Sequence, residues 1–200
     1  MADALPERAQ VLIDFWFGPP GDPEREQNRK IWFKSTPEYD DELRRLFFAD
    51  YEEAASGALA PWEAGAESTL ALLLLLDQIP RNIFRSMPQA YATDAVAREV
   101  AGRALERGFD QDIPPNWRKF LYMPLHHSED LADQERATAL FAALPHDGVP
   151  EDQRGGLRRY GVSYVDVIAR FGRFPHRNTI LGRVSTPEEI AFMEKTRSSG

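Results

Sequence analysis

Apolar residues recur every three or four positions along most of the chain, and this spacing predicts helices almost throughout. Prolines and glycines mostly stand where such helices would begin or end; Gly18, for example, follows the apolar stripe of Val11–Phe17. Strand-like alternation of apolar and polar residues is scarce. The pattern therefore predicts an all-α fold.

One segment is apolar on every side, as expected for a helix surrounded by other helices. It runs from Gly65 to Gln78 and contains Leu70 and the unbroken run Leu72–Leu76. Short connections between consecutive amphipathic helices make neighbours antiparallel. We therefore expect stacked antiparallel helical hairpins around this leucine-rich central helix.

Polar residues mark the expected helix starts. Thr36 precedes Pro37, Thr93 precedes Asp94, and Thr186 stands three residues before Glu189 in the spacing of a capping box. Ser128 is expected to cap a helix that runs to Leu144, and a long helix is expected from Leu157 to Gly172. Ile31, Trp32 and Phe33 are expected on a further helical stretch.

The length of 200 residues is typical of one domain, so residues 1–200 are expected to form a single helical domain. Residues 197–200 are expected to be a frayed tail. The net charge of −8 argues against nucleic-acid binding. Cysteine is absent, which fits a reducing, cytoplasmic location. No signal peptide stands at the N-terminus, and the longest apolar run, Leu70–Leu76, is too short to cross a membrane.

Charge is distributed unevenly along the chain. Acidic residues predominate from Glu38 to Glu67, whereas arginines predominate from Arg154 to Arg183. Either the two regions face each other, or the arginine-rich region lines an anion site.

The first of three polar segments at expected helix ends runs from Asp77 to Arg85 (DQIPRNIFR). It places Asp77, Arg81 and Asn82 beside the core, where they would contribute to a ligand site. The alternative is an Asp-Arg pair that joins helix ends without any chemistry.

The second segment runs from Tyr122 to Asp130 (YMPLHHSED). Consecutive histidines on an extended stretch point in opposite directions, so at most one of His126 and His127 would face a given pocket. One of the two histidines is a candidate proton carrier, because imidazole titrates near neutral pH. Glu129 is explained as a first-turn acid of the following helix, and His127 and Glu129 are both kept as catalytic candidates. No metal-ligand spacing is present, and no metal or cofactor is expected.

The third segment runs from Arg173 to Arg183 (RFPHRNTILGR) and echoes the first, since a proline precedes an Arg-Asn pair in both. Arg177 and Asn178 would join Arg81 and Asn82 in a clamp for phosphate or carboxylate oxygens, with His176 as a further catalytic candidate. The alternative is that both Arg-Asn pairs bind backbone carbonyls at tight helix corners.

The sequence lacks the motifs of several common classes of enzyme. It contains no glycine-rich phosphate loop, no nucleophile elbow and no dinucleotide fingerprint. The common nucleotide-binding enzymes are thereby excluded.

Several motifs together resemble a known family, the mainly bacterial domain of unknown function 924. They are VLIDFWFG at Val11–Gly18, Trp32-Phe33, LLLDQIPRNIFR at Leu74–Arg85, FLYMPLHHSEDL at Phe120–Leu131, FGRFPHRNTILGR at Phe171–Arg183, and Ser185–Glu189. The resemblance spans nearly the whole chain. It implies an all-α fold similar to tetratricopeptide-like helical arrays, and no established activity. Members commonly have Met-His where this chain has His126-His127, so the resemblance implies no role for His126.

Two hypotheses about function follow from these residues. In the first, the protein binds a small anionic molecule, or acts on it as a hydrolase-like enzyme, in one pocket lined by Asp77, Arg81, Asn82, His127, Glu129, His176, Arg177 and Asn178. In the second, it is a helical-repeat interaction module whose groove receives a peptide and whose polar motifs only fix helix corners. Convergence of the three segments would favour the first hypothesis, and three separate corners the second.

Overall fold

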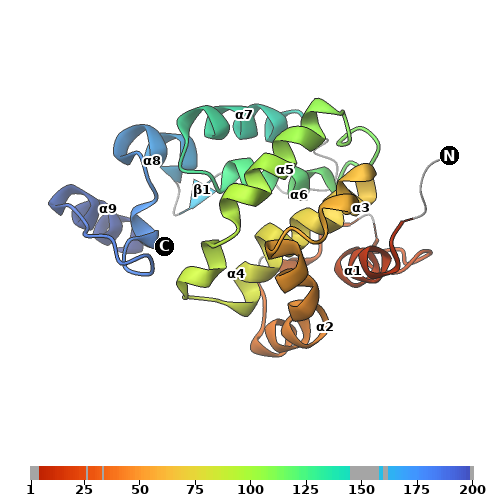
Figure 1. Ribbon diagram of the computed structural model, residues 1–200. Coiled ribbons are helices and arrows are strands. Elements are labelled where there is room, and N and C mark those ends of the chain that lie inside the picture. The colour runs from red at the N-terminus through yellow and green to blue at the C-terminus, as the bar shows by residue number, and fades with distance from the viewer. Residues whose placement is uncertain (1–4, 26, 33, 145–157, 160–161, 199–200) are drawn as a thin grey trace.

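The computed structural model describes residues 5–25, 27–32, 34–144, 158–159 and 162–198 (Figure 1). The prediction of an all-α fold is confirmed. The α-helices of these residues are α1 (Glu7–Phe17), α2 (Pro37–Ala55), α3 (Ala66–Leu73), α4 (Ile79–Ile83), α5 (Asp94–Glu106), α6 (Arg118–His126), α7 (Leu131–Ala142), α8 (Tyr164–Phe171) and α9 (Pro187–Ser198).

Shorter elements connect these helices. Four are 3-10 turns, namely η1 (Lys30–Trp32), η2 (Ala60–Ala64), η4 (Pro88–Tyr91) and η6 (Pro175–Arg177). The element η3 (Leu74–Gln78) is a π-helix. Two-residue strands, β1 (Arg158–Arg159) and β2 (Val162–Ser163), pair antiparallel before α8.

The expected capping residues start α2 and α9. The Thr36 hydroxyl accepts a hydrogen bond from the backbone N–H of Tyr39, and the Thr186 hydroxyl accepts one from that of Glu189. The Glu189 carboxylate accepts in return from the N–H of Thr186, which completes a capping box. At the other end of a helix, Gly172 ends α8 with a φ of 64°, a conformation that glycine adopts without strain.

The central helix continues past its expected end through a π-helical turn. Pro80 has no N–H to donate to the preceding turn, and its ring would crowd a regular α-helix. The chain widens at η3 instead, where the N–H of Ile79 donates to Leu74 O, five residues back. The Thr93 hydroxyl donates to Leu76 O at 2.6 Å, and Arg81 Nη1 donates to Asp77 O at 2.7 Å. Side chains thus bind two carbonyls of the widened turn.

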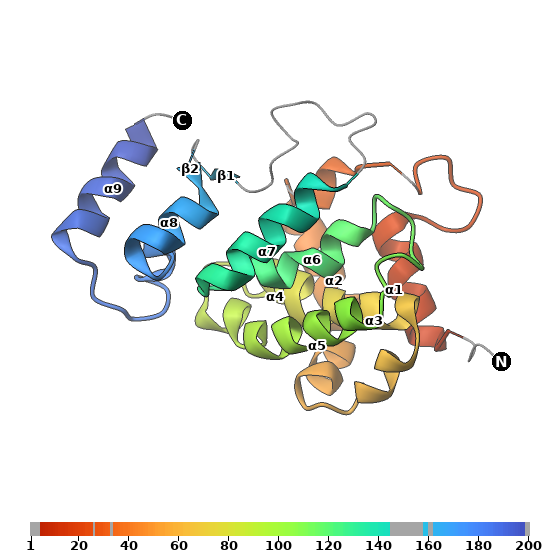
Figure 2. The same ribbon diagram turned by 90° about the horizontal axis from the view of Figure 1, so that it is seen from above.

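The leucine-rich segment lies at the centre, as predicted. Its leucines from Leu70 to Leu76 are at most 3% exposed, and α3 packs against α1, α5 and α6. Helix α6 also packs against α7, and α2 packs against α4 (Figure 2). Burial of these apolar surfaces supplies most of the stabilisation of the fold.

The C-terminal helices form one end of the molecule in both views, and α1 lies at the other end (Figures 1 and 2). Helices α8 and α9 have a hydrophobic cluster of their own, with Val167, Ile168 and Phe174 buried and Phe192 packed against them. Contact with the rest of the fold is made mainly between α8 and α7.

Several local expectations were wrong. The histidines do not lie on an extended stretch, because His126 is the last residue of α6 and His127 follows as its C-cap. Asp130, rather than Ser128, caps α7 through the backbone N–H groups of Ala132 and Asp133. The Ser128 hydroxyl instead accepts from the N–H of Asp130. Helix α6 continues through Pro124 to His126, and this places the histidines at a helix end.

Other expected helices are shorter than the sequence pattern indicated. The stretch around Trp32 is only the 3-10 turn η1, and Phe33 lies outside the described residues. The helix expected from Leu157 begins at Tyr164, and Leu157 itself is not described. Helix α9, by contrast, extends to Ser198, which lies within the stretch 197–200 that was expected to fray.

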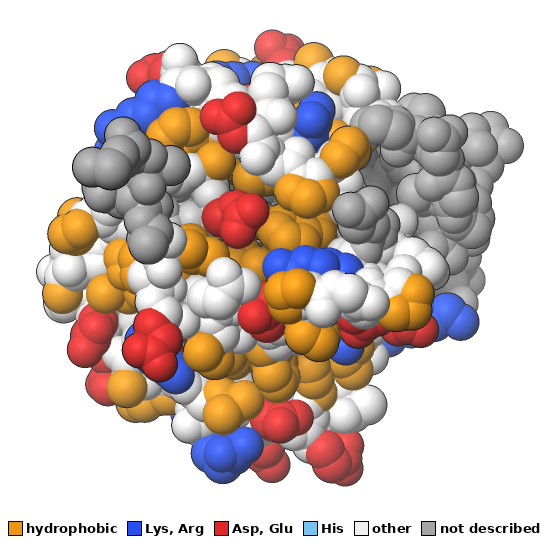
Figure 3. Space-filling view, turned by 90° about the vertical axis from the view of Figure 1, so that its right-hand side faces the viewer, with side chains coloured by type: hydrophobic (Ala, Val, Ile, Leu, Met, Phe, Trp, Pro, Cys, Tyr) orange, Lys and Arg blue, Asp and Glu red, His pale blue; other side chains and the backbone are white. Residues whose placement is uncertain are grey.

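The face at the α1 end carries hydrophobic, acidic and basic side chains side by side (Figure 3). No basic stripe is formed by the described side chains of this face. None of the described helices combines the length and apolar character needed to cross a membrane.

Candidate functional site

Asp77 lies at the centre of the polar interior, with an exposed fraction of 0%. Its carboxylate oxygens lie 2.8 Å and 3.0 Å from Nδ1 of His127, and Arg81 Nη1 lies 3.2 Å from Oδ1. Gln78 donates a further hydrogen bond to Oδ2. Burial by itself would raise the pKa of Asp77, but Arg81 and His127 outweigh it and lower that pKa below its usual range. Asp77 is therefore a buried, ionised carboxylate.

His127 is held by Asp77 through one ring nitrogen. Burial lowers the pKa of His127, and Arg81 lowers it further, against the opposite effect of Asp77. The neutral ring donates its Nδ1 proton to the carboxylate, which leaves Nε2 as a proton acceptor. Nε2 makes no hydrogen bond with the described residues, and the side chain is 15% exposed.

Arg81 joins Asp77 to Asp94, the first residue of α5. Its Nη2 donates to Asp94 Oδ2 at 2.9 Å, and its Nη1 lies 2.9 Å from Oδ1. Although close to Arg81, Oδ1 is buried and accepts no hydrogen bond from the described residues. Burial would lower the pKa of Arg81, but Asp77 and Asp94 more than compensate and raise it. The positive charge of Arg81 is thus balanced by the carboxylates of Asp77 and Asp94.

Arg177 approaches the same carboxylate from η6 with weaker pairing. Its Nη1 lies 3.5 Å from Asp94 Oδ2, its Nη2 donates to the backbone carbonyl of His127 at 2.9 Å, and its Nε has no hydrogen-bond partner among the described residues. The Arg177 side chain is only 7% exposed. Burial lowers the pKa of Arg177 and so does Arg81, despite Asp94 and Glu129. Its positive charge is incompletely matched.

Asp77, Arg81, Asp94, His127 and Arg177 are called the Asp77 cluster below. Both of its arginines lie near the ring of Tyr91, whose centroid is 5.6 Å from Arg81 Cζ and 4.8 Å from Arg177 Cζ. Members of all three polar segments therefore meet at one place. Solvent reaches the cluster at His127, Arg81 and Asp94, whose side chains are 15%, 19% and 21% exposed.

The asparagines do not join the Asp77 cluster. Asn82 donates to Asp40 Oδ1, and the same carboxylate accepts from Arg85. Asn178 donates to Glu189, whose carboxylate is also bound by Arg173. The expectation that each Arg-Asn pair points into one pocket is therefore wrong. Successive residues of a helix differ by about 100° in direction, so the two members of each pair diverge.

Glu129 binds the C-terminal part of the chain rather than His127. It accepts a hydrogen bond from the backbone N–H of Phe174 at 2.7 Å, and Arg183 binds both of its oxygens at 2.6 Å and 2.9 Å. Burial would raise the pKa of Glu129, but the hydrogen bond from Arg183 and that from Phe174 lower it. The Glu129 carboxylate thus has a structural role, in which it binds Phe174 and Arg183.

The other histidines lie beside aromatic rings. His176 lies against Phe174, with ring centroids 5.4 Å apart. His126 stacks on Tyr164 at 4.3 Å and is 2% exposed. No hydrogen bond joins either ring to the charged groups of the Asp77 cluster among the contacts of the described residues.

Sequence reasoning missed two residues of this region. Asp94 was read only as a helix start, and Tyr91 was not considered at all. Their proximity to Arg81 comes from the η4 turn, which reverses the chain after α4. In the sequence, the sign of this contact is that Asp94, an acidic residue, follows Arg81 by thirteen positions.

The Asp77 cluster offers guanidinium donors rather than a set of metal ligands. In the residues that the structure describes, no group of three or more His, Asp or Glu side chains lies close enough to hold one. Its donors are guanidinium N–H groups, which suit carboxylate and phosphate oxygens.

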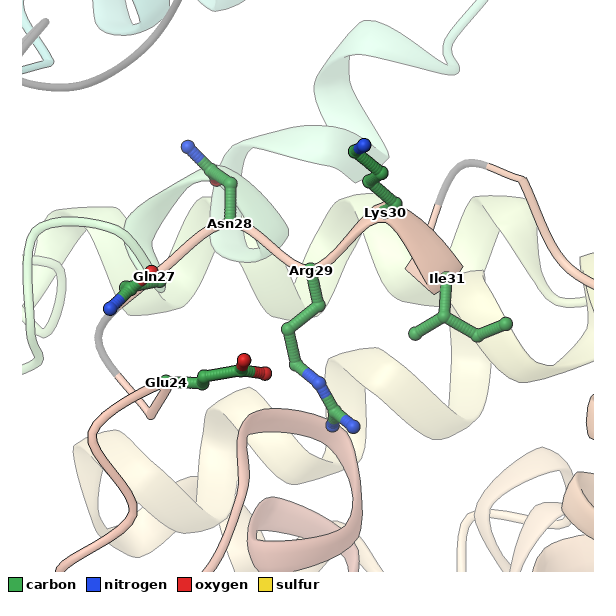
Figure 4. A pocket seen from close by; sticks show the side chains of 6 residues that line it. All are labelled: Glu24, Gln27, Asn28, Arg29, Lys30 and Ile31. Carbon is green, nitrogen blue, oxygen red and sulfur yellow. The ribbon is translucent and has the colours of Figure 1, made fainter.

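A surface hollow of about 330 Å³ lies elsewhere, in the segment between α1 and η1. It is lined by Glu24, Gln27, Asn28, Arg29, Lys30 and Ile31 (Figure 4). The side chains of Asn28 and Lys30 lie on the opposite side of this segment from Arg29, which is bound to backbone carbonyls of α1. The hollow shares no residue with the Asp77 cluster, and we prefer the cluster because its buried groups converge.

Comparison with known proteins places the chain in a family. A solved structure of a protein of unknown function from Agrobacterium tumefaciens is 38% identical, with a TM-score of 0.78, over 94% of this chain and 97% of that one. No curated protein matches the sequence. The model of a family described as bacterial protein of unknown function, DUF924, matches residues 12–197. The chain belongs to the DUF924 family of bacterial proteins of unknown function.

Proposed function

We propose that the protein binds a small anionic molecule at the Asp77 cluster, with Arg177 as the principal anion-binding group. The observation that carries this proposal is the incomplete pairing of a buried guanidinium. Arg177 has one long contact to Asp94, one bond to a carbonyl, and a buried Nε with no partner among the described residues.

The direction of the arginine pKa values supports this choice. The pKa values of Arg8, Arg81, Arg103 and Arg173 are raised by carboxylate partners. That of Arg177 is lowered by burial and by Arg81. A bound anion would match this charge and restore the pKa of Arg177, so binding is favoured electrostatically.

Hydrolase-like chemistry is a second candidate function, which one observation favours. A buried carboxylate that fixes the tautomer of a neutral histidine is the arrangement of a general base. Asp77 and His127 have this geometry at 2.8 Å, and the acceptor Nε2 belongs to a partly exposed side chain. Glu129 and His176 are not needed for this role.

The interaction-module hypothesis accounts better for the remaining polar residues. Asn82 and Asn178 fix helix corners through Asp40 and Glu189. A tetratricopeptide-like stacking, a peptide ligand and a cytoplasmic location stay predictions.

Anion binding is tested by thermal shift with phosphate, sulfate and small carboxylates on three proteins. They are the wild type, Arg177→Gln, and Arg103→Gln as a matched control, because Arg103 pairs bidentately with Glu63 outside the cluster. At 100 times the dissociation constant, binding should add about 2.7 kcal/mol to the wild type and the control. Arg177→Gln should respond only through the non-specific effect of salts. An equal response of all three proteins would refute the proposal.

A further inference from the structure

Helices α8 and α9 and the turn η6 between them, residues 164–198, are called the C-terminal unit below. Their hydrophobic cluster, which includes Phe174, shares no residue with the main core of the other described helices. Within the unit, Glu189 accepts hydrogen bonds from Arg173, at 2.6 Å and 2.8 Å, and from Asn178 at 3.2 Å. These contacts lie inside the unit and are kept if it moves away from the other helices.

Besides the packing of α8 on α7, charged groups join the C-terminal unit to the rest of the protein. Glu129 accepts a hydrogen bond from the N–H of Phe174 at 2.7 Å, and its two oxygens bind Arg183 at 2.6 Å and 2.9 Å. The side chains of Glu129 and Arg183 are 26% and 24% exposed, so water competes for this ion pair. One aromatic contact adds to these, the stack of Tyr164 on His126. The ion pair of Glu129 can therefore open without exposing the main core.

Arg177 is the member of the Asp77 cluster that belongs to the C-terminal unit. Its Nη2 donates to the backbone carbonyl of His127 at 2.9 Å, and its Nη1 lies 3.5 Å from Asp94 Oδ2. Arg177 Nε and Asp94 Oδ1 are buried atoms, so an anion in solvent reaches them only when the contacts of Arg177 open. A buried charge is favoured only when it is well paired, so Arg177, with its long contact to Asp94, loses little by moving into water.

We propose that the C-terminal unit is a lid on the Asp77 cluster, that Glu129 is the latch of this lid, and that an anion binds Arg177 once the lid is open. This rests on the proposed function, since it describes how the ligand reaches the same site. Glu129 suits the role because its partners, Phe174 and Arg183, stand at the two ends of one segment. That segment carries Arg177. An anion that binds the open form shifts the equilibrium toward it.

Opening of the lid is measured without ligand, by hydrogen–deuterium exchange of backbone amides at pH 7, read by mass spectrometry. Glu129→Gln and Arg183→Gln each break the latch, so each should speed the exchange of α8 at least about 5-fold and leave α3 unchanged. Glu63→Gln and Arg103→Gln are the matched controls, because they break a bidentate pair outside the C-terminal unit. The controls should leave α8 unchanged. Unchanged exchange of α8 in both latch variants, or equal acceleration of α8 and α3, would overturn the lid.

Phosphate then tests whether the lid controls access, with dissociation constants measured by isothermal titration calorimetry at pH 7. A larger open fraction raises the apparent affinity, so Glu129→Gln and Arg183→Gln should both bind phosphate at least about 3-fold more tightly than the wild type. A purely electrostatic effect would instead act in opposite directions, because one variant loses a negative charge and the other a positive one. Opposite or absent changes would overturn the control of access but leave anion binding intact. Absence of phosphate binding would remove the proposed function, whereas the exchange rates without phosphate would still decide whether the lid opens.

Discussion

Asp77 holds the ring of His127 through both carboxylate oxygens, at 2.8 Å and 3.0 Å from Nδ1. The two residues are fifty positions apart in sequence, and the π-helical turn η3 carries one of them while the end of α6 carries the other. Because Asp77 is fully buried, this contact joins the central helix to α6 in a region where water does not screen charge.

Removal of Asp77 should destabilise the protein strongly. Asp77→Ala leaves the Arg81 guanidinium and the His127 ring without their buried partner, and breaking a buried ion pair in this way costs about 3–5 kcal/mol. The free energy of unfolding is measured by urea denaturation at pH 7. Asp133→Ala, which breaks the more exposed pair with Arg98, should cost less than about 1 kcal/mol. An unchanged unfolding midpoint in Asp77→Ala would contradict the buried position of this residue.

Glu189 should make the stability of the C-terminal helices depend on acid pH. Hydrogen bonds from Arg173 and Thr186 lower the pKa of Glu189 to about 2, whereas an unfolded glutamate has a pKa of about 4.3. The folded-state pKa is depressed, so the stabilisation is present above the unfolded value and is lost as the pH falls toward 2. Glu189→Gln should therefore be less stable than wild type at pH 7, with a difference that shrinks between pH 4.5 and pH 2.5.

The neighbouring Glu188 serves as the control for Glu189. It pairs with Arg170, and both side chains are more than half exposed, at 64% and 52%. Glu188→Gln should change the free energy of unfolding by less than about 1 kcal/mol. Equal effects of the two substitutions at pH 7 would show that the capping box and the Arg173 contact contribute nothing specific.

Lys119 should react as an amine near neutral pH. Burial lowers its pKa to about 7, and Nζ lies 4.4 Å from the ring centroid of Trp32. A lysine in a model peptide has a pKa of about 10.4, and Lys34, whose side chain is exposed, serves as the reference residue. Trace labelling with acetic anhydride, read by mass spectrometry, should give Lys119 a pH profile with its midpoint near 7. The same profile for Lys119 and Lys34 would refute the shift.

Much of the fold could be predicted from the sequence because its signals are local. Thr36, Gly172 and the Thr186–Glu189 box act within one helical turn, and the leucine run is apolar on all sides. The π-helical turn was not predictable, since it depends on Pro80 and on the Thr93 hydroxyl, which reaches Leu76 from another element.

The candidate site was only partly predictable, for a similar reason. Asp77, Arg81, His127 and Arg177 meet as expected, but the partners of Asn82, Asn178 and Glu129 are Asp40, Glu189 and Arg183. Sequence spacing gives the direction of a side chain relative to its own helix, whereas its partner depends on how helices pack. The contact of Asp94 with Arg81 was not predicted, because an acidic residue in the first turn of a helix is usually explained by the helix dipole.

His127 should make the wild type less stable as the pH falls below 6.5. Burial and Arg81 lower the pKa of His127 below the value of about 6.5 expected for the unfolded chain, and Asp77 and Asp94 only partly oppose them. Between the two pKa values the unfolded chain binds a proton that the folded protein does not, so stability rises with pH in this window. The free energy of unfolding is measured by urea denaturation from pH 5 to pH 7.5. His127→Gln keeps an N–H that can donate to Asp77 and has no proton to bind in this range, so its stability should change less between pH 5 and pH 6.5. The same slope in the variant and the wild type would show that His127 is not buried as a neutral ring, and would leave the acceptor Nε2 without support.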